Sequence, residues 1–156
     1  MVDNAKKSLV LIVDDVGTNI DVLKGILHEI YDIKFALNGK TAIEIASKEP
    51  NPDIILLDVM MPEMNGYEVC TQLKQDASTS HIPVIFVTAF DDLTGELKGF
   101  EVGGVDYITK PVVPEIVLAR VNTHLKLKEV TEKLAEYALR MEKLADNKLD
   151  LDSPNA

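Results

Sequence analysis

Short runs of apolar residues alternate along this chain with amphipathic segments of helical length. Three of the runs are continuous and rich in valine and isoleucine, which is typical of strands buried on both faces of a parallel sheet. These runs are SLVLIV (8–13), DIILL (53–57) and IPVIFV (82–87), and two weaker candidates are YDIKFAL (31–37) and VDYIT (105–109). The pattern therefore predicts five strands.

Each of the first four predicted strands is followed by a segment with helical periodicity, in which apolar residues recur at steps of three and four. The segments are 18–29, 39–48, 66–74 and 92–102. In the last segment the apolar positions are Leu93, Leu97 and Phe100. Strand and helix alternating five times predict an α/β fold with an open, doubly wound sheet and right-handed crossovers.

One long helical stretch follows Pro114, with neither glycine nor proline before Pro154. Its apolar residues recur at alternating steps of three and four, the heptad pattern of a coiled coil. A single helix cannot bury such a seam, so we expect a homodimer through it. We divide the chain into a domain of residues 1–125 and a coiled-coil or linker helix of residues 126–156 with a frayed end. The seam positions are Leu127, Val130, Leu134, Tyr137, Met141, Leu144, Lys148 and Leu151.

Composition and charge exclude several classes of function. The chain has 16 basic and 26 acidic residues and a net charge of −10, so we expect no direct binding of nucleic acid, which needs clustered Lys and Arg. No apolar run approaches the roughly 20 residues that span a bilayer, so we expect no membrane insertion. The N-terminal MVDNAKKS has no secretory signal pattern, which predicts a cytoplasmic protein. Cys70 is the only cysteine, which excludes an intramolecular disulfide.

Polar residues follow the predicted strands where an open α/β sheet places its functional loops, at the carboxyl ends of the strands. Asp14 and Asp15 follow the first strand, Asp58 the third, Thr88 the fourth and Lys110 the fifth. Mg²⁺ prefers oxygen ligands, commonly one or two carboxylates together with a phosphate. We therefore expect the three aspartates to hold Mg²⁺ close to a phosphoryl group.

The same residues match what phosphoryl transfer requires, which is a nucleophile in line with the bond and positive or hydrogen-bonding groups on the phosphoryl oxygens. The Asp58 carboxylate is the candidate nucleophile, because a carboxylate can form an acyl phosphate. Lys110 supplies a positive charge and Thr88 a hydroxyl donor. The backbone carbonyl of Met60 is a further candidate metal ligand. The segment MMPEMNG (60–66) has the proline and glycine of a tight connection.

Four motifs together resemble the receiver domain of bacterial response regulators over about residues 8–125. They are DD (14–15), DVMMPEMNGYE (58–68), VTA (87–89) and DYITKP (106–111). The resemblance implies a flavodoxin-like (βα)5 fold with sheet order 2-1-3-4-5. It also implies phosphorylation of Asp58 by a sensor histidine kinase or phosphotransfer protein, with Mg²⁺ and slow self-dephosphorylation, and a switch formed by Thr88 and Tyr107. Such a protein is a regulatory phosphoacceptor rather than an enzyme.

Two other classes of function fit this sequence less well. A haloacid-dehalogenase-type phosphatase needs a second aspartate two residues after the nucleophile, where this chain has Met60. A flavodoxin-like flavin binder needs a phosphate loop after the first strand, where DDVGTN would set two carboxylates against an anion. Two alternatives stay open: an interaction or dimerisation module that works without phosphorylation, and the regulatory part of a larger output enzyme such as a cyclic-dinucleotide cyclase or phosphodiesterase.

Overall fold

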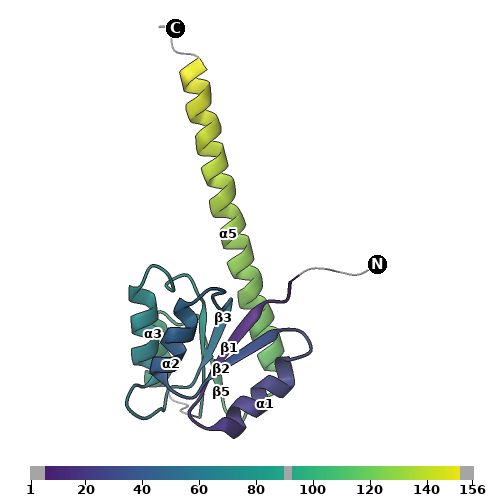
Figure 1. Ribbon diagram of the computed structural model, residues 1–156, viewed down its shortest axis with the longest axis vertical. Coiled ribbons are helices and arrows are strands. Elements are labelled where there is room, and N and C mark those ends of the chain that lie inside the picture. Colours follow the sequence, from purple (N-terminus) through teal and green to yellow (C-terminus); the bar gives the residue numbers. More distant parts are fainter. Residues whose placement is uncertain (1–5, 90–92, 152–156) are drawn as a thin grey trace. The chain divides into compact units, whose positions relative to one another are not determined.

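The computed structural model describes residues 6–89 and 93–151 of the chain. In this part of the chain, strands and helices alternate as a doubly wound α/β fold with a long C-terminal helix (Figure 1), which confirms the predicted fold class. The elements are β1 (Leu9–Val13), α1 (Gly17–Leu27), β2 (Asp32–Ala36), α2 (Gly39–Ser47), β3 (Ile54–Leu57), α3 (Gly66–Gln75), β4 (Val84–Thr88), α4 (Leu93–Glu101), β5 (Asp106–Thr109) and α5 (Pro114–Leu151).

The sheet has the strand order β2-β1-β3-β4-β5, and every neighbouring pair is parallel. The predicted order 2-1-3-4-5 is therefore confirmed. Strand bounds differ from the predicted ones by one or two residues. The largest shift is in the fourth strand, which was predicted for 82–87 and begins at Val84, because Pro83 has no N–H with which to join the ladder.

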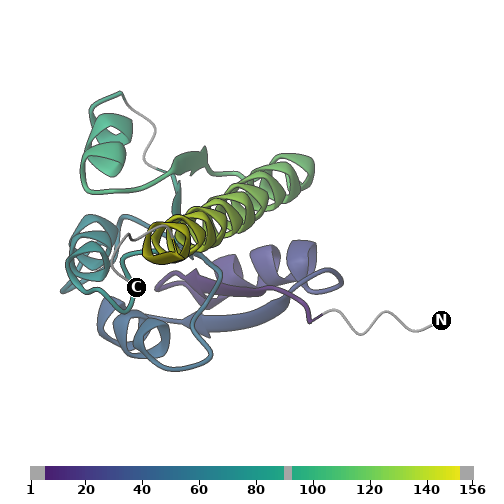
Figure 2. The same cartoon turned by 90° about the horizontal axis from the view of Figure 1, so that it is seen from above.

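Two helical layers cover the sheet, with α1 and the start of α5 on one face and α2, α3 and α4 on the other (Figure 2). Successive side chains of a strand point to opposite faces, so the central strands must be apolar at every position. All the residues of β3 and β4 are buried, as are those of β1 after Leu9. Burial on both faces explains why these strands read as continuous apolar runs.

Helix α4 differs from the sequence prediction in the face that it buries. Its core-facing positions are two glycines, Gly95 and Gly99, and a Cβ added at Gly99 would lie 3.0 Å from the ring of Phe86 in β4. The helix thus packs closely on the sheet through its smallest residues. The predicted apolar stripe instead points to solvent, with exposed fractions of 72% for Leu93, 60% for Leu97 and 50% for Phe100.

The Asp106 carboxylate joins the beginning of β5 to the first part of α5. Asp106 accepts hydrogen bonds from Arg120 Nη1 at 3.1 and 3.2 Å and lies 2.9 Å from Nε2 of His124. Burial raises the pKa of the Asp106 carboxyl, but these bonds, the positive charge of Arg120 and the backbone N–H of Tyr107 together hold it below its usual value. The carboxylate therefore stays charged while it joins strand to helix.

Residues 125–156 form a unit separate from residues 1–124, and their described part is the continuation of α5. Within this unit the seam residues from Leu127 to Leu144 are exposed to solvent. Ion pairs one turn apart support the helix, between Glu129 and Lys133 at 2.8 Å and between Lys128 and Glu132 at 2.9 Å.

Across residues 6–89 and 93–151, no helix combines the length and the apolar character needed to cross a bilayer.

Candidate functional site

The carboxyl ends of β1, β3, β4 and β5 meet at one edge of the sheet, and polar side chains follow them there. Backbone hydrogen bonds continue the ladder past the strand ends. Asp58 N–H donates to the carbonyl of Val13 at 2.9 Å, and Lys110 N–H donates to the carbonyl of Thr88 at 2.9 Å. The loops are thus held in register where they leave the sheet, so residues far apart in sequence are brought together.

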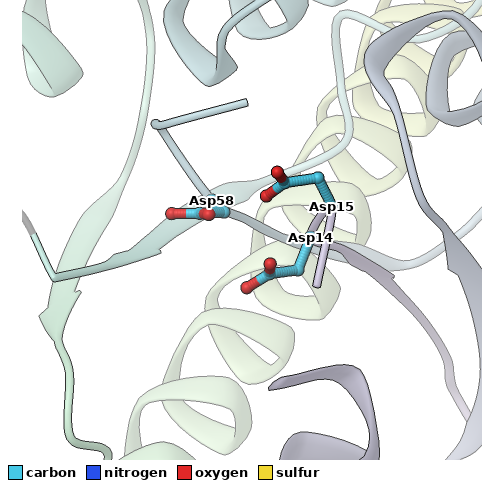
Figure 3. A group of neighbouring side chains, drawn as sticks. All are labelled: Asp14, Asp15 and Asp58. Carbon is cyan, nitrogen blue, oxygen red and sulfur yellow. The ribbon is translucent and has the colours of Figure 1, made fainter. Parts of the chain in front are cut away.

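Three carboxylates lie together at this edge. Each of Asp14, Asp15 and Asp58 offers one oxygen, and these oxygens all lie within 4.8 Å of one another. Figure 3 shows the three side chains gathered where their strands end. Asp14 and Asp58 are buried and Asp15 is exposed. The backbone N–H of Val16 donates to Asp14 Oδ1 at 2.9 Å, which orients that carboxylate. Such a group of oxygens fits a hard divalent cation.

Lys110 places a positive charge against the same group. Its Nζ lies 2.6 Å from Asp14 Oδ2 and 3.8 Å from Asp58 Oδ2, and its side chain is 18% exposed. One ammonium group thus offsets part of the repulsion among three carboxylates. Because Lys110, Asp14 and Asp58 are largely shielded from water, the interactions among these three charges are stronger than those of a surface ion pair.

The Asp58 carboxyl has a raised pKa, and its neighbours explain the shift. Burial has the largest effect and raises the pKa, the positive charge of Lys110 lowers it, and the negative charge of Asp14 raises it again. Hydrogen bonds from the hydroxyl of Thr88 and from the backbone of Val59 also lower the pKa, but they do not outweigh burial. Asp58 is therefore a buried carboxyl whose charged form is disfavoured by burial and supported by a hydroxyl and an ammonium group beside it.

The loop between Asp58 and α3 folds back onto the phosphoacceptor candidate. Gly66 begins α3, and a Cβ added there would lie 2.2 Å from the carbonyl oxygen of Asp58. The N–H of Gly66 donates to the carbonyl of Val59 at 2.9 Å. A capping box formed by Asn65 and Glu68 fixes the start of the helix. Only glycine allows this close approach, so the backbone at Asp58 depends on Gly66.

Tyr107 lies on β5 in a row of aromatic rings that runs beside the site. Its ring centroid is 6.3 Å from that of Phe86, which is 5.4 Å from that of Tyr67. The hydroxyl of Tyr67 donates to the carbonyl of Gly95 in α4 at 3.0 Å. The row therefore links α3, β4, β5 and α4. Tyr107 is half-buried, and its expected role in a switch stays a prediction.

The structure brings together most of the residues that the sequence singled out. Asp14, Asp15, Asp58 and Lys110 form one cluster, and Thr88 is a hydrogen-bond partner of Asp58. Met60 lies two residues beyond Asp58 with an exposed side chain, and its carbonyl as a metal ligand stays a prediction.

Two contacts were missed by the sequence analysis: Lys110 with Asp14, and Gly66 with the Asp58 carbonyl. The proline and glycine of the loop hinted at the second, but nothing local to the sequence indicates the first, since its partners are 96 positions apart.

Residues 10–122 match the family model of the response regulator receiver domain. The chain therefore belongs to this family, as its four motifs predicted. Among its relatives, it is 45% identical over 126 residues to a probable cyclic di-GMP phosphodiesterase of Vibrio cholerae, a match that covers 81% of this chain and 28% of that protein. It is 40% identical over 117 residues to the protein PilH of Pseudomonas aeruginosa, covering 74% of this chain and 96% of PilH.

A solved structure agrees with this assignment. The BeF3-activated receiver domain of DrrB, from Thermotoga maritima, is 34% identical and has a TM-score of 0.70, and the match covers 77% of this chain and 98% of that domain. The chain thus spans 96% of PilH, but only 28% of the probable cyclic di-GMP phosphodiesterase.

The contact of Gly66 with Asp58 gives a test of the loop. We expect Gly66→Ala to lower the free energy of unfolding by about 1–3 kcal/mol, because the added methyl group overlaps the Asp58 carbonyl and the backbone must shift. Urea unfolding followed by circular dichroism measures the change. Gly25→Ala is the matched control, since a Cβ there meets nothing within 4 Å. Equal urea midpoints for the two variants would contradict this account of the loop.

Proposed function

We propose that this receiver domain accepts a phosphoryl group on Asp58 from a sensor histidine kinase or a phosphotransfer protein, in the cytoplasm. The observation that carries the proposal is the position of the Asp58 carboxylate, which lies buried between two further carboxylates and the ammonium group of Lys110. A carboxylate in this setting has the groups that phosphoryl transfer needs on each side of it. The chain acts as a regulatory phosphoacceptor rather than as an enzyme.

In the proposed transfer, a carboxylate oxygen of Asp58 forms a bond to phosphorus. The bond between phosphorus and the donor's nitrogen or oxygen breaks, and its electron pair stays with the donor. Lys110 neutralises negative charge on the phosphoryl oxygens, since its Nζ already lies 3.8 Å from Asp58. The Thr88 hydroxyl, which is within hydrogen-bonding reach of Asp58, donates to another phosphoryl oxygen.

The acidic cluster fits Mg²⁺ by the chemistry of its donors. Asp14, Asp15 and Asp58 supply carboxylate oxygens within 4.8 Å of one another, and the Met60 carbonyl is the proposed further ligand. Bound Mg²⁺ would neutralise charge on the carboxylates and on the phosphoryl group. Asp14 also faces Lys110, so this aspartate keeps the ammonium group close to the site as well as binding the cation.

Phosphorylation would replace the single negative charge of the Asp58 carboxylate by a phosphoryl group that carries a charge of about −1.5 to −2. We propose that this charge draws Thr88 and Lys110 toward the phosphoryl group and that the ring of Tyr107 turns inward. Such a change alters the surface formed by α4, β5 and the start of α5. Because α5 continues into the heptad helix, the proposed output is a change in homodimerisation or in the binding of a partner protein, without membrane insertion or direct contact with nucleic acid.

A second candidate function follows from one of the relatives. The chain matches 28% of a probable cyclic di-GMP phosphodiesterase at 45% identity, which favours a role as the regulatory part of a larger output enzyme. Phosphoacceptor chemistry at Asp58 is the same in both cases. A module that dimerises without phosphorylation is the remaining alternative, and it predicts that small phosphodonors leave the chain unmodified.

We expect the wild-type chain to gain one phosphoryl group, about 80 Da, when it is incubated with acetyl phosphate and Mg²⁺. Asp58→Asn should gain none, because the amide cannot form the acyl phosphate. Intact-mass spectrometry measures both. Asp76→Asn is the matched control, since Asp76 caps a turn at Ser78 away from the cluster. It should be labelled like the wild type, and EDTA should prevent labelling in each variant.

Labelling of the Asp58→Asn variant to the wild-type extent would contradict the assignment of the phosphoacceptor. Labelling that is indifferent to EDTA would contradict the metal site but not the phosphoacceptor.

We expect the double substitution Leu134→Lys and Leu144→Lys to raise the dissociation constant of a homodimer by about 100-fold or more, since two large apolar side chains leave the seam. Sedimentation equilibrium measures the constant. Leu139→Lys is the control, because this exposed leucine lies outside the heptad positions. If the double variant associates like the wild type, the helix is not the dimer interface.

A further inference from the structure

The heptad seam of α5 has two flanks of different character. Four positions adjoin the seam on one side, here called the basic flank: Lys126, Lys133, Arg140 and Asn147. Three positions adjoin it on the other side, here called the small flank: Thr131, Ala138 and Ala145. All of them lie within one uninterrupted helix, and all are at least partly exposed. The residues beside a heptad seam set the orientation of a coiled coil.

The two possible orientations bring these flanks together differently. In a parallel pair of helices, the basic flank of one copy lies along the small flank of the other. In an antiparallel pair, the basic flanks lie along each other, so Lys133 and Arg140 would face ammonium and guanidinium groups of the second copy. Like charges that face each other across two helices repel, so the charge pattern disfavours the antiparallel arrangement.

We propose that two copies of this chain pair in parallel and in register through α5, and that Arg140 of each copy forms an ion pair with Glu142 of the other. This inference rests on the proposed homodimer and specifies its direction and its polar contacts. Ala138 and Ala145 are the reason that Arg140 can reach Glu142, because their methyl groups leave the path across the small flank open. A long arginine side chain can lie over such a surface and keep its charged end in water.

Among the basic residues of the flanks, only Arg140 is left with an acidic partner on the other copy, and that partner is Glu142. Lys133 already pairs with Glu129 of its own helix at 2.8 Å. Within the part of α5 whose side chains are described, Arg140 and Glu142 form no ion pair. Lys126 would lie along Thr131 and close to Lys128, which offers it no acidic partner. Arg140 with Glu142 is therefore the charge match that the parallel arrangement makes possible.

Lys148 occupies a seam position near the end of the helix. In a parallel, in-register pair, the two Lys148 side chains meet in one layer, from which both ammonium groups can reach water. In an antiparallel pair centred on the seam, Lys148 would instead lie opposite Val130. A single lysine at such a position is known to specify register at a cost in stability, so Lys148 reports directly on the orientation.

The experiment uses the full chain with Lys148→Cys, oxidised under mild conditions at a concentration where the wild type is dimeric by sedimentation. The parallel arrangement predicts a disulfide between the two residues at position 148. Peptide mass spectrometry separates this linkage from one through Cys70, which is buried. The same oxidation in 6 M urea shows the background of random linkage.

The ion pair is tested by Arg140→Glu, which should weaken the dimer about 3- to 10-fold at low salt. The combined variant Arg140→Glu with Glu142→Arg should return to within about twofold of the wild type. Lys143→Glu is the matched control, because it makes the same change of charge on the side of the helix away from the seam. The differences in dissociation constant among these variants should shrink in about 0.5 M NaCl, because salt screens exposed charges.

Each outcome decides between the proposals. A wild type that stays monomeric removes the proposed homodimer, and the orientation with it. A dimer that forms no disulfide between the 148 positions overturns only the parallel arrangement. A dimer that is linked at position 148, but is weakened equally by Arg140→Glu and Lys143→Glu, overturns the assigned ion pair. Linkage at 148 together with rescue by the charge exchange supports the proposal in full.

Discussion

Crowding of like charge at the edge of the sheet is the constraint on which the rest of the site depends. Asp14, Asp15 and Asp58 present oxygens within 4.8 Å of one another, and the nearby positive charge of Lys110 lies 2.6 Å from Asp14. A packed sheet must hold these groups in place against their mutual repulsion. Five parallel strands in the order 2-1-3-4-5 do so, because backbone hydrogen bonds fix the residues that directly follow several strands. The apolar strands of the core thus also hold the aspartates in place at the edge of the sheet.

The proposed function connects this crowding of charge with regulation. A cation that binds the folded domain, and not the unfolded chain, stabilises the domain by mass action. Under the proposed function, a phosphoryl group on Asp58 would favour whichever arrangement of Thr88 and Lys110 best satisfies its charge. The row of rings from Tyr67 to Tyr107 links α3, β4, β5 and, through the Tyr67 hydroxyl, α4, and the carboxylate of Asp106 joins the start of β5 to α5. We propose these contacts as the physical route by which a local change of charge at Asp58 reaches the surface.

Most of the fold could be predicted from the sequence because buried parallel strands have a direct signature. The continuous apolar runs located the three central strands, and the polar residues after them located the cluster of aspartates. The face of α4 could not be predicted in this way. Amphipathic spacing indicated Leu93, Leu97 and Phe100 as core positions, whereas the helix packs through Gly95 and Gly99. Periodicity counts apolar side chains and cannot show where a close approach needs none. The contact of Lys110 with Asp14 was also out of reach, because it arises from the packing of strands distant in sequence.

The most direct test of the central claim, that this cluster is a phosphoacceptor site, is amide NMR of the wild-type chain with Mg²⁺ and then beryllofluoride, an analogue of the phosphoryl group. The account predicts that Mg²⁺ shifts the amides of Asp14, Asp15 and Asp58. Beryllofluoride should then shift those of Thr88 and Lys110, and only when Mg²⁺ is present. Unchanged Thr88 and Lys110 amides in the presence of both additives would contradict it.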